Sequence, residues 1–532
     1  MAKQPRPPAV PQTSLFPFFP GILNHRFAGL GLAGMYFIVM LLISLQYHVV
    51  GDYNVETDFY WSYVPQARHI LEGIIPIEDF HGPAYPMVLA FLSLFTRDLF
   101  HAGVALSTFA GAVSLFLIFD LLKKLFRPDI ALFAALLVAV NTTFVRYSYT
   151  AGTDMLFMAL ITASTFFFLR EEQMRWSNIA LSAVFAAIGY LTRYNGLSAV
   201  VGVPAAVILA NPFQQTMRDR LRASAVFIGV FLLVIAPWGT YCLIQKGSFF
   251  YNRNYLNIAF EMFAKGKIGW DQYWYGEAQK FTSLTQVIFA DPGLFATSLV
   301  RNLIDHASSD FDLLLGWQVG IFSLLGIAAF VKYRPTSRVL SYFLIGAAFF
   351  GVLLLVFYGE RFSMVLLPVY GVLALKALSV PALAQFRFWK TIQAGGIIAF
   401  VLVIWTMNSS LNFNRDNIDS GPREVLSFGS WFHQNYGDSE RGKIVIARKP
   451  HIAYYLDMKL EMFPYVDTYE QLVAEMRRSK ASYLYFSRME AGMRPQFQQL
   501  LDPRNAPKEL RPITYTTNPP AVLYKIDLGA TP

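Results

Sequence analysis

The sequence contains little charge and a single cysteine. Only 15% of its 532 residues are charged, against roughly a quarter in soluble globular domains, and this shortage excludes an ordinary water-soluble protein. The one cysteine, Cys242, lies in an apolar run, so no internal disulfide can form and a cysteine-based metal site is disfavoured. The phosphate-binding pattern GxxxxGK[ST] is absent too, which argues against a chain powered by a nucleotide that it binds itself.

Long apolar runs dominate the rest of the chain. Hydrophobic residues make up 55% of the sequence, and several runs reach the roughly 18 to 20 residues that a membrane-spanning helix needs. No small-residue cleavage site follows the first run, so we interpret that run as a retained span and not as a signal peptide. The pattern predicts eleven spans, near residues 27–50, 101–122, 129–145, 151–169, 177–192, 196–211, 223–243, 311–331, 339–357, 362–379 and 392–409.

The basic residues predict how these spans are oriented. A net charge of +9 would suit a nucleic-acid-binding protein, but most of the lysines and arginines fall in short loops, so we expect no nucleic acid partner. Every second loop is basic, which is typical of cytoplasmic loops. We therefore expect a cytoplasmic N-terminus in a multi-pass protein, and the compact loops without disulfides favour a bacterial inner membrane. The basic groups are Lys3, Arg6 and Arg26; Lys123, Lys124 and Arg127; Arg170 and Arg175; Arg218, Arg220 and Arg222; Lys332, Arg334 and Arg338; and Lys376, Arg387 and Lys390.

Three regions follow from this pattern. Residues 1–26 form a cytoplasmic tail, and residues 27–409 form the transmembrane domain, with outer loops at 51–100 and 244–310. Residues 84–96 are apolar but too short to cross the membrane, which suits a helix lying in the interface. From about residue 410 to 532 charges become dense and strand-like stretches alternate with helical ones, so we expect a small α/β domain outside the membrane, in the periplasm or extracellular space.

The polar stretch Gly51–Pro86, directly after the first span, holds the strongest candidates for catalysis. Asp58 is flanked by Phe59, Tyr60 and Trp61, and partial burial among these rings would raise its pKa and make it a usable proton acceptor. A solvated loop carboxylate is the alternative. Glu56 lies two residues earlier, and the sequence does not decide which of the two acids is the base.

Further polar residues lie at the expected outer ends of spans. Asp154 opens the fourth span, where it could be a second catalytic acid or could simply favour the helix dipole. Asp79 and His81 end the first loop, and turn chemistry is their plain alternative. We expect contacts with the substrate from Tyr60, Asp79, His81 and Tyr194.

Three arginines are candidates for binding a phosphate group. Arg146, Arg193 and Arg361 lie at the expected outer ends of spans, and the planar guanidinium binds phosphate oxygens bidentately. Each arginine could instead reach to lipid headgroups, and Arg361 could pair with Glu360 next to it.

Five stretches, taken in order, resemble the polytopic GT-C glycosyltransferases. They are ETDFYWSYVPQARHILEG, IPIEDFHGPAYPMVLAF, YSYTAGTDMLFMAL, LTRYNGL and YGERFSMVLLPVYGVLA. Within that class, the chain is similar to the dolichyl-phosphate-mannose protein mannosyltransferases and the bacterial lipid A aminoarabinose transferases. The resemblance covers about 400 residues of the membrane part. It implies a GT-C-like fold of about eleven transmembrane helices.

The resemblance also implies a reaction. A sugar carried on a polyprenyl phosphate passes, with inversion, to an acceptor hydroxyl of a glycan, lipid or protein at the outer face of the bilayer. Asp58 would be the base, assisted by Asp154, while Arg193 and Arg361 would hold the donor phosphate. The turn His81-Gly82-Pro83-Ala84 differs from the aminoarabinose transferases, which argues against aminoarabinose as the sugar. Metal dependence stays open, because Asp58 and Asp154 could share a divalent cation, but no dense cluster of ligands in the sequence demands one.

Two other classes of function use a similar chain. A transporter or flippase for lipid-linked sugars would favour charges near the bilayer midplane and internal repeats. A non-catalytic envelope assembly protein would use the outer domain as a binding module. The spans keep their charges near their ends, and no inverted repeat is evident, so we favour the transferase.

Overall fold

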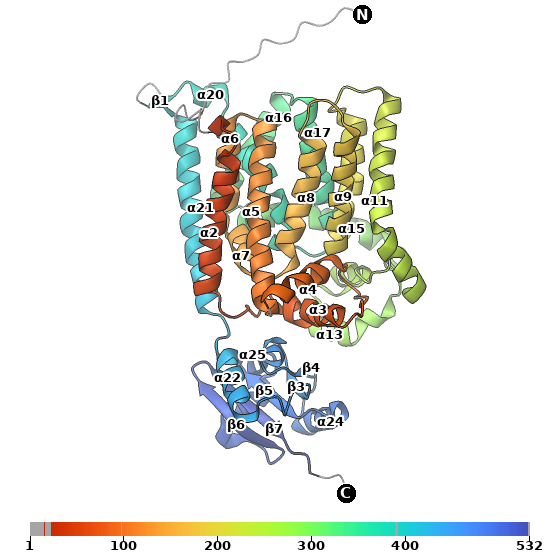
Figure 1. Cartoon of the computed structure of the whole chain (residues 1–532), viewed down its shortest axis with the longest axis vertical. Helices are drawn as coiled ribbons and strands as arrows, with labels where there is room; N and C mark the ends of the chain where they lie inside the picture. Colours follow the sequence, from red (N-terminus) through yellow and green to blue (C-terminus); the bar gives the residue numbers. More distant parts are fainter. Residues whose placement is uncertain (1–14, 16–22, 97, 389–391, 530–532) are drawn as a thin grey trace, which may run out of the picture.

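The computed structural model describes residue 15 and residues 23–96, 98–388 and 392–529. Lys3, Arg6 and Lys390, which belong to the predicted orientation pattern, lie outside the described residues, as does most of the predicted tail 1–26. The described chain forms a bundle of helices with a smaller domain that contains a β-sheet at one end (Figure 1).

The helices of the bundle are long, apolar and mostly parallel or antiparallel to one another (Figure 1). Helix α5 runs through the centre and packs against α2, α6 and α8. Their apolar side chains form one continuous core. The bundle helices are α2 (Ala28–Gln46), α5 (Leu99–Leu125), α6 (Pro128–Ala139), α7 (Thr142–Tyr149), α8 (Thr153–Leu169), α9 (Trp176–Thr192), α10 (Leu197–Ala205), α11 (Met217–Lys246), α16 (Trp317–Lys332), α17 (Ser337–Leu353), α18 (Glu360–Ser363), α19 (Leu367–Leu378) and α21 (Ala394–Asp419).

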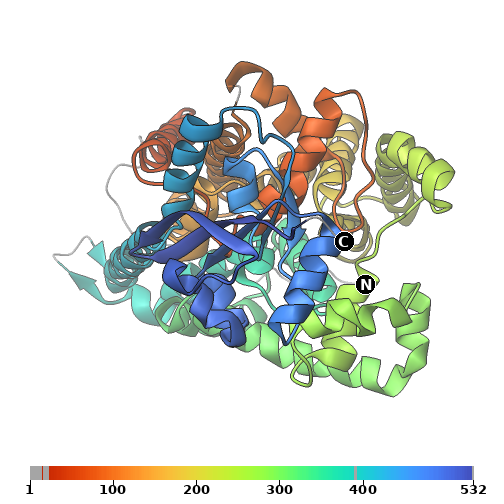
Figure 2. The same cartoon turned by 90° about the horizontal axis from the view of Figure 1, so that it is seen from below.

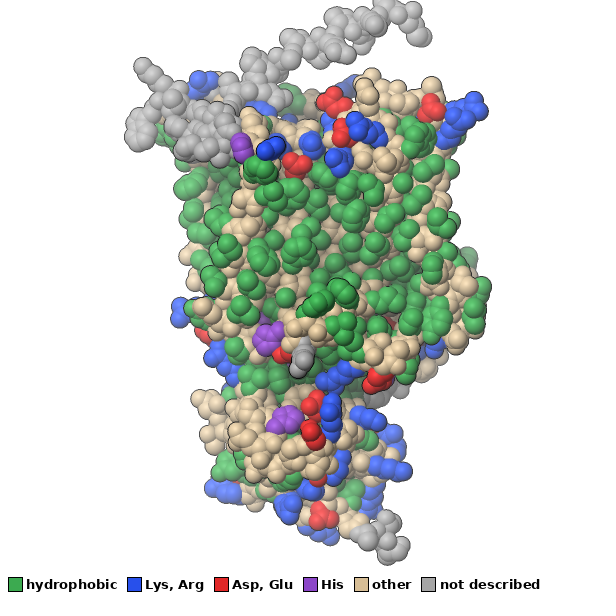
Figure 3. Space-filling model, in the orientation of Figure 1, with side chains coloured by type: hydrophobic (Ala, Val, Ile, Leu, Met, Phe, Trp, Pro, Cys, Tyr) green, Lys and Arg blue, Asp and Glu red, His purple; other side chains and the backbone are tan. Residues whose placement is uncertain are grey.

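A belt of hydrophobic side chains covers the bundle, and charged side chains gather above it and on the smaller domain (Figure 3). Within the described residues, five helices are long and apolar enough to span a membrane, or seven if each of two bent helix pairs is one span. Six shorter apolar helices accompany them. The chain is thus a polytopic α-helical membrane protein, while the number of eleven spans stays a prediction.

The span expected near residues 129–145 is not one straight helix. Helices α6 and α7 meet at an angle of 61°. Asn141 causes the break, because its side chain caps α7 by accepting from the N–H groups of Thr143 and Phe144. Its amide also donates to the carbonyl of Leu314 at 2.6 Å.

The basic loops gather at the end of the bundle opposite the sheet domain. The connections α5–α6, α8–α9 and α16–α17 all lie at this end (Figure 1). Arg338 at the start of α17 donates to the carbonyl of Leu169 at the end of α8, at 2.6 Å. The Lys376 ammonium lies 5.6 Å from the ring of Phe126, at the end of α5. This clustering is what the predicted orientation requires.

The two predicted outer loops fold mostly into short helices, of which α3, α4 and α13 lie at the opposite end, towards the sheet domain (Figures 1 and 2). The exception is α15, which has 18 residues. The helix predicted at residues 84–96 is present as α4. The first loop contains η1 (Phe59–Tyr63), α3 (Val64–Leu71) and α4 (Ala84–Thr96). The second contains α12 (Tyr255–Ala259), η4 (Phe260–Ala264), α13 (Trp270–Tyr275), η5 (Glu277–Lys280), α14 (Leu284–Ala290), α15 (Pro292–Ser309) and η6 (Asp310–Leu314).

The C-terminal part is the α/β domain that the sequence predicts. Its five-stranded sheet has the order β4-β3-β5-β7-β6, with parallel pairing of β3 to β4 and β5, and antiparallel pairing of β7 to β5 and β6. Helix α21 continues to Asp419, beyond the span end expected at residue 409. The strands are β3 (Ile444–Ala447), β4 (Lys459–Met462), β5 (Tyr483–Ser487), β6 (Leu510–Thr517) and β7 (Pro520–Ile526), and the helices are α22 (Glu424–Tyr436), α23 (His451–Tyr455), α24 (Tyr469–Ser479) and α25 (Arg488–Met493).

Candidate active site

Asp58 and Arg361 form an ion pair between the first outer loop and the start of α18. The Arg361 guanidinium donates to the Asp58 carboxylate at 3.2 Å. Asp58 precedes η1 directly, and 39% of its side-chain surface is exposed. Burial alone would raise the pKa of Asp58, but the positive charges of Arg361, His81 and Arg193 hold it below the ordinary value. The upward pKa shift expected from the sequence is therefore wrong, because cationic side chains lie near Asp58 as well as aromatic rings.

Asp154 and Arg193 form a second pair of the same kind. One nitrogen of Arg193 donates to the Asp154 carboxylate at 2.7 Å and to the Thr153 hydroxyl at 2.9 Å. Asp154 opens α8, and Arg193 follows the last residue of α9. Both side chains are largely buried, at 7% and 10% exposure. Gly152, and not Thr153, is the N-cap of α8, so the Thr153 hydroxyl is left to accept from Arg193.

The side chain of Phe362 brings the two pairs together. The guanidinium carbon of Arg193 lies 5.0 Å from the centre of the Phe362 ring, and that of Arg361 lies 4.9 Å from it. Tyr63 joins the group, because its hydroxyl lies 3.4 Å from the Thr153 hydroxyl. The structure thus gathers Asp58, Asp154, Arg193 and Arg361, which are far apart in sequence, into one cluster, the two-arginine cluster.

Glu56, the alternative base, is fully buried and lies outside this cluster. Its carboxylate accepts from the backbone N–H groups of Ala151 at 2.5 Å and Asp52 at 2.8 Å. The same carboxylate lies 2.9 Å from the ring nitrogen Nε2 of His48. With three partners and no exposed surface, Glu56 ties the first loop to the turn before α8. Of the two acids, only Asp58 has an exposed side chain.

Arg146, expected to bind the donor phosphate, is occupied by another acid. Its guanidinium donates to the Asp52 carboxylate at 2.5 Å. Asp52 also accepts from the backbone N–H of Val55 at 3.0 Å, so this pair anchors the beginning of the first loop to α7. Arg146 makes no contact with the two-arginine cluster among the hydrogen bonds and ion pairs of the described residues.

The expected substrate-contacting residues occupy three different positions. The ring of His81 lies 5.1 Å from that of Tyr63, which places it beside the two-arginine cluster. Tyr194 donates to the His81 carbonyl at 3.3 Å. Asp79 accepts from Tyr251 at 2.7 Å and from Arg253 at 3.2 Å, and so joins the two outer loops. Tyr60 is buried under the C-terminal domain, with its ring 4.4 Å from that of His451.

Comparisons with known proteins bear on the family and the fold of the chain. Residues 80–241 match the family model of the dolichyl-phosphate-mannose-protein mannosyltransferases. The structure superposes on ArnT from Cupriavidus metallidurans, solved with undecaprenyl phosphate, with a TM-score of 0.60, 12% identity, and coverage of 96% of this chain and 100% of ArnT. The fold is that of a GT-C glycosyltransferase. The resemblance predicted from the sequence is therefore confirmed.

A second GT-C structure extends the comparison. The archaeal oligosaccharyltransferase AglB from Archaeoglobus fulgidus, in complex with an inhibitory peptide and a dolichol-phosphate, matches with a TM-score of 0.57 and 12% identity, over 89% of this chain and 70% of AglB. Both solved relatives hold a polyprenyl phosphate lipid. No curated protein matches the chain by sequence.

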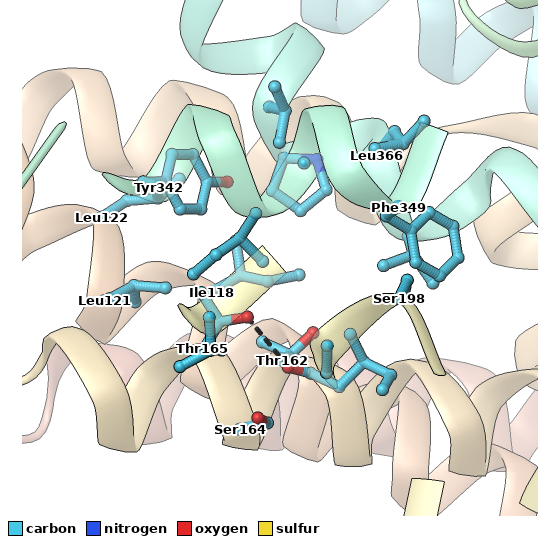
Figure 4. Close-up of a pocket in the computed structure, with 18 residues that line it drawn as sticks. Ile118, Leu121, Leu122, Thr162, Ser164, Thr165, Ser198, Tyr342, Phe349 and Leu366 are labelled. Carbon is cyan, nitrogen blue, oxygen red and sulfur yellow. Dashed lines mark hydrogen bonds between the residues drawn. The ribbon is translucent and has the colours of Figure 1, made fainter. Parts of the chain in front are cut away.

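An apolar cavity of about 50 Å³ lies inside the bundle of this GT-C fold (Figure 4). It is bounded by side chains of α5, α8, α10 and α17 and by the segment after α18, among them Ile118, Thr162, Ser198, Phe349 and Leu366. No acid or cation lines it. The cavity therefore offers no group for sugar transfer, and the two-arginine cluster remains the candidate active site.

The candidate site does not fit a divalent cation. Asp58 and Asp154 each pair with an arginine, and a site with two carboxylates and two guanidiniums has no surplus negative charge for a metal ion. Within the described residues, no group of three or more His, Cys, Asp or Glu side chains is placed to hold one.

Sequence reasoning missed three members of the site. Tyr63 was visible only as one of several loop aromatics, and Phe362 only as the neighbour of Arg361. Thr153 stood out only as the neighbour of Asp154. Their roles depend on contacts between helices, for example the 3.4 Å approach of Tyr63 to Thr153, and no local pattern in the sequence predicts such contacts.

Proposed function

We propose that this protein is a glycosyltransferase that moves a sugar from a polyprenyl-phosphate donor to an acceptor hydroxyl, with inversion and with Asp58 as the general base. The observation that carries the proposal is the two-arginine cluster. It places one accessible carboxylate beside two guanidiniums at the end of the bundle that carries the C-terminal domain. A transfer of this kind needs such a base and such cations.

In this proposal, Arg361 and Arg193 bind the donor phosphate. Guanidinium groups bind phosphate oxygens bidentately and keep their charge when buried. During transfer, the acceptor oxygen forms a bond to the anomeric carbon while the bond from that carbon to the phosphate oxygen breaks. The electron pair leaves with the phosphate, and the two arginines stabilise the negative charge on the departing polyprenyl phosphate.

Asp58 takes the proton of the acceptor hydroxyl. In the structure its carboxylate is paired with Arg361 and its pKa is depressed, so it is ionised at neutral pH but weakly basic. A donor phosphate competes for the same guanidinium. When Arg361 turns to the phosphate, Asp58 loses its nearest positive charge and becomes a stronger base. Donor binding and activation of the base are thereby coupled.

Asp154 supports the reaction indirectly. It holds Arg193 at 2.7 Å, which fixes the direction of that guanidinium. His81 and Tyr63 border Asp58 on the side of the first loop, where they are available to contact the sugar or the acceptor. The substrate contact proposed for Tyr60 is not supported, because that ring is buried under the C-terminal domain.

The orientation belongs to the same proposal. Basic loops cluster at one end of the bundle, and the C-terminal domain lies at the other (Figure 1). The two-arginine cluster lies at the start of α8 and the end of α9, away from the basic loop that joins these two helices. By the positive-inside rule, the basic end faces the cytoplasm. The site then faces the periplasm or exterior of an inner membrane, where the donor lipid and an acceptor glycan, lipid or protein meet.

Turnover by the purified protein tests the proposal. The protein is incubated in lipid nanodiscs with polyprenyl-phosphate sugars and an extract of envelope acceptors, and free polyprenyl phosphate is measured. We expect its release together with a glycosylated acceptor. A flippase reconstituted in vesicles would move labelled donor between leaflets with the sugar–phosphate bond intact. That outcome, or no release with any donor, would contradict the proposal.

A further inference from the structure

The C-terminal domain holds the loop that carries Asp58. Lys449 lies between β3 and α23 of that domain, and its ammonium reaches into the first outer loop. It donates to the backbone carbonyl of Tyr53 at 2.6 Å and to the hydroxyl of Thr57 at 2.9 Å. No other lysine of the described residues donates to this loop in the hydrogen bonds of the structure.

These contacts close a small ring directly before Asp58. The hydroxyl of Thr57 donates to the Tyr53 carbonyl at 2.5 Å, so the ammonium, the hydroxyl and the carbonyl all bond to one another. This hydrogen-bonded ring stabilises the turn from Tyr53 to Thr57. Because Asp58 is the next residue, the contacts of Lys449 with this turn also fix the position of the Asp58 backbone.

His451, two residues after Lys449, contacts the other end of the same turn. It is fully buried, and its Nε2 lies 3.2 Å from the carbonyl of Asp52. Its ring packs edge-on against that of Tyr53 at 4.8 Å. Burial, with the charge of Lys449, lowers the pKa of His451 to about 3, so its ring is neutral at physiological pH and its Nε2–H donates to the carbonyl.

Lys449 interacts electrostatically with Asp58, in addition to its hydrogen bonds with the turn. The ammonium is half-buried, and burial and the charge of Arg448 lower its pKa, while the negative charges of Asp58 and Asp52 oppose that change. Lys449 therefore lies within electrostatic range of the proposed base without bonding to it.

We propose that Lys449 is a positioning residue for Asp58, so that the C-terminal domain completes the active site of the membrane domain. The inference rests on the proposed function only for its effect on the reaction rate. The hold of Lys449 on the loop is a property of the folded chain and can be measured without any substrate.

The test compares Lys449→Met with Lys449→Arg in the full-length protein. Methionine keeps the length of the side chain and removes the donor, whereas arginine restores donors for both acceptors. Lys459→Met is the matched control, because Lys459 is exposed in the same domain and makes no side-chain contact with the loop among the described hydrogen bonds.

Hydrogen exchange gives the readout that needs no substrate. We expect backbone amides of residues 53–58 to exchange at least tenfold faster in Lys449→Met, and at close to the wild-type rate in Lys449→Arg and Lys459→Met. Exchange should stay unchanged in the strands of the C-terminal sheet, which shows that the domain is still folded. Unchanged exchange at residues 53–58 in Lys449→Met would overturn the inference, as would exchange that rises equally in all three variants.

Turnover gives the second readout. Displacing a reacting group by about 1 Å costs roughly 100-fold in rate, so kcat of Lys449→Met should fall by about 10- to 100-fold. Its KM for the donor should stay within about twofold, because Arg193 and Arg361 are untouched. Lys449→Arg should recover most of kcat. A raised KM at unchanged kcat would overturn the inference by making Lys449 a substrate-binding residue. Absence of wild-type turnover would instead contradict the proposed function and leave hydrogen exchange to decide the inference.

Discussion

Arg193, directly after α9, and Arg361, in α18, lie over the same aromatic ring, at 5.0 Å and 4.9 Å from the centre of Phe362. Two guanidiniums this close repel each other unless negative charge or an electron-rich ring face compensates. Phe362 supplies the ring, and Asp58 and Asp154 supply the charges. A bound phosphate would add a third source of negative charge. The charges of the cluster balance without a ligand, so a donor phosphate has to compete with Asp58 for Arg361.

Replacing the shared ring should weaken donor binding. We expect Phe362→Leu to raise the KM for the donor about tenfold, because each cation–π contact is worth roughly 0.5–2 kcal/mol. Phe362→Tyr keeps the ring and should stay within about twofold of the wild type. Steady-state kinetics with varied donor check this expectation. Equal KM values in the leucine and wild-type proteins would show that the ring does not support the arginines.

The acid limb of the pH–rate profile should respond to Arg361. The guanidinium beside Asp58 helps to hold the pKa of that carboxyl below its ordinary value in the donor-free protein. The ratio kcat/KM reports the free enzyme, so in the wild type it should begin to fall only below the ordinary pKa range of an aspartate. Removing the positive charge in Arg361→Gln disfavours the ionised carboxylate and raises the pKa. The fall in kcat/KM should therefore begin at a higher pH.

The exposed residue Arg441 provides the control for this profile. Arg441→Gln should leave the acid limb where it is in the wild type. The pH at which kcat/KM begins to fall reports the base, whereas weaker donor binding lowers kcat/KM at every pH. An acid limb at the same pH in Arg361→Gln and the wild type would contradict the role of Arg361 beside Asp58.

Substitutions of Glu56 and of Asp58 should differ in their effect on the stability of the protein. Glu56→Gln leaves buried partners, including the N–H groups of Ala151 and Asp52, with a poorer acceptor. We expect a loss of about 1–3 kcal/mol in the free energy of unfolding, measured by thermal or denaturant unfolding in detergent. Asp58→Asn should change stability by less than this. A Glu56→Gln protein that is stable but inactive would indicate that Glu56, and not Asp58, is the base.

The sequence predicted the features that depend on local patterns. Apolar runs indicated the helices of the bundle, and alternating strand-like and helical stretches indicated the C-terminal α/β domain, which the structure contains. The polar first loop stood out because acids and aromatic residues followed an apolar run directly. Each of these signals extends over a few neighbouring residues.

Features that depend on contacts over long distances in the sequence escaped prediction. Glu56 and Asp58 are two residues apart, yet one is fully buried and the other 39% exposed, because the Glu56 carboxylate contacts Ala151 and His48. Arg146 pairs with Asp52 and not with the two-arginine cluster. Lys449 gave no signal at all, because its contacts join two domains.

The most direct measurement of the central claim is the rate at which Asp58→Asn releases free polyprenyl phosphate in the presence of acceptor. A positioned base contributes about two to four orders of magnitude, so kcat should fall by at least about 100-fold while the protein stays folded and its affinity for the donor persists. The control is Asp438→Asn, which changes an exposed acid of the C-terminal domain and should keep the wild-type rate. An Asp58→Asn protein that turns over within about tenfold of the wild type would contradict the assignment of Asp58 as the base.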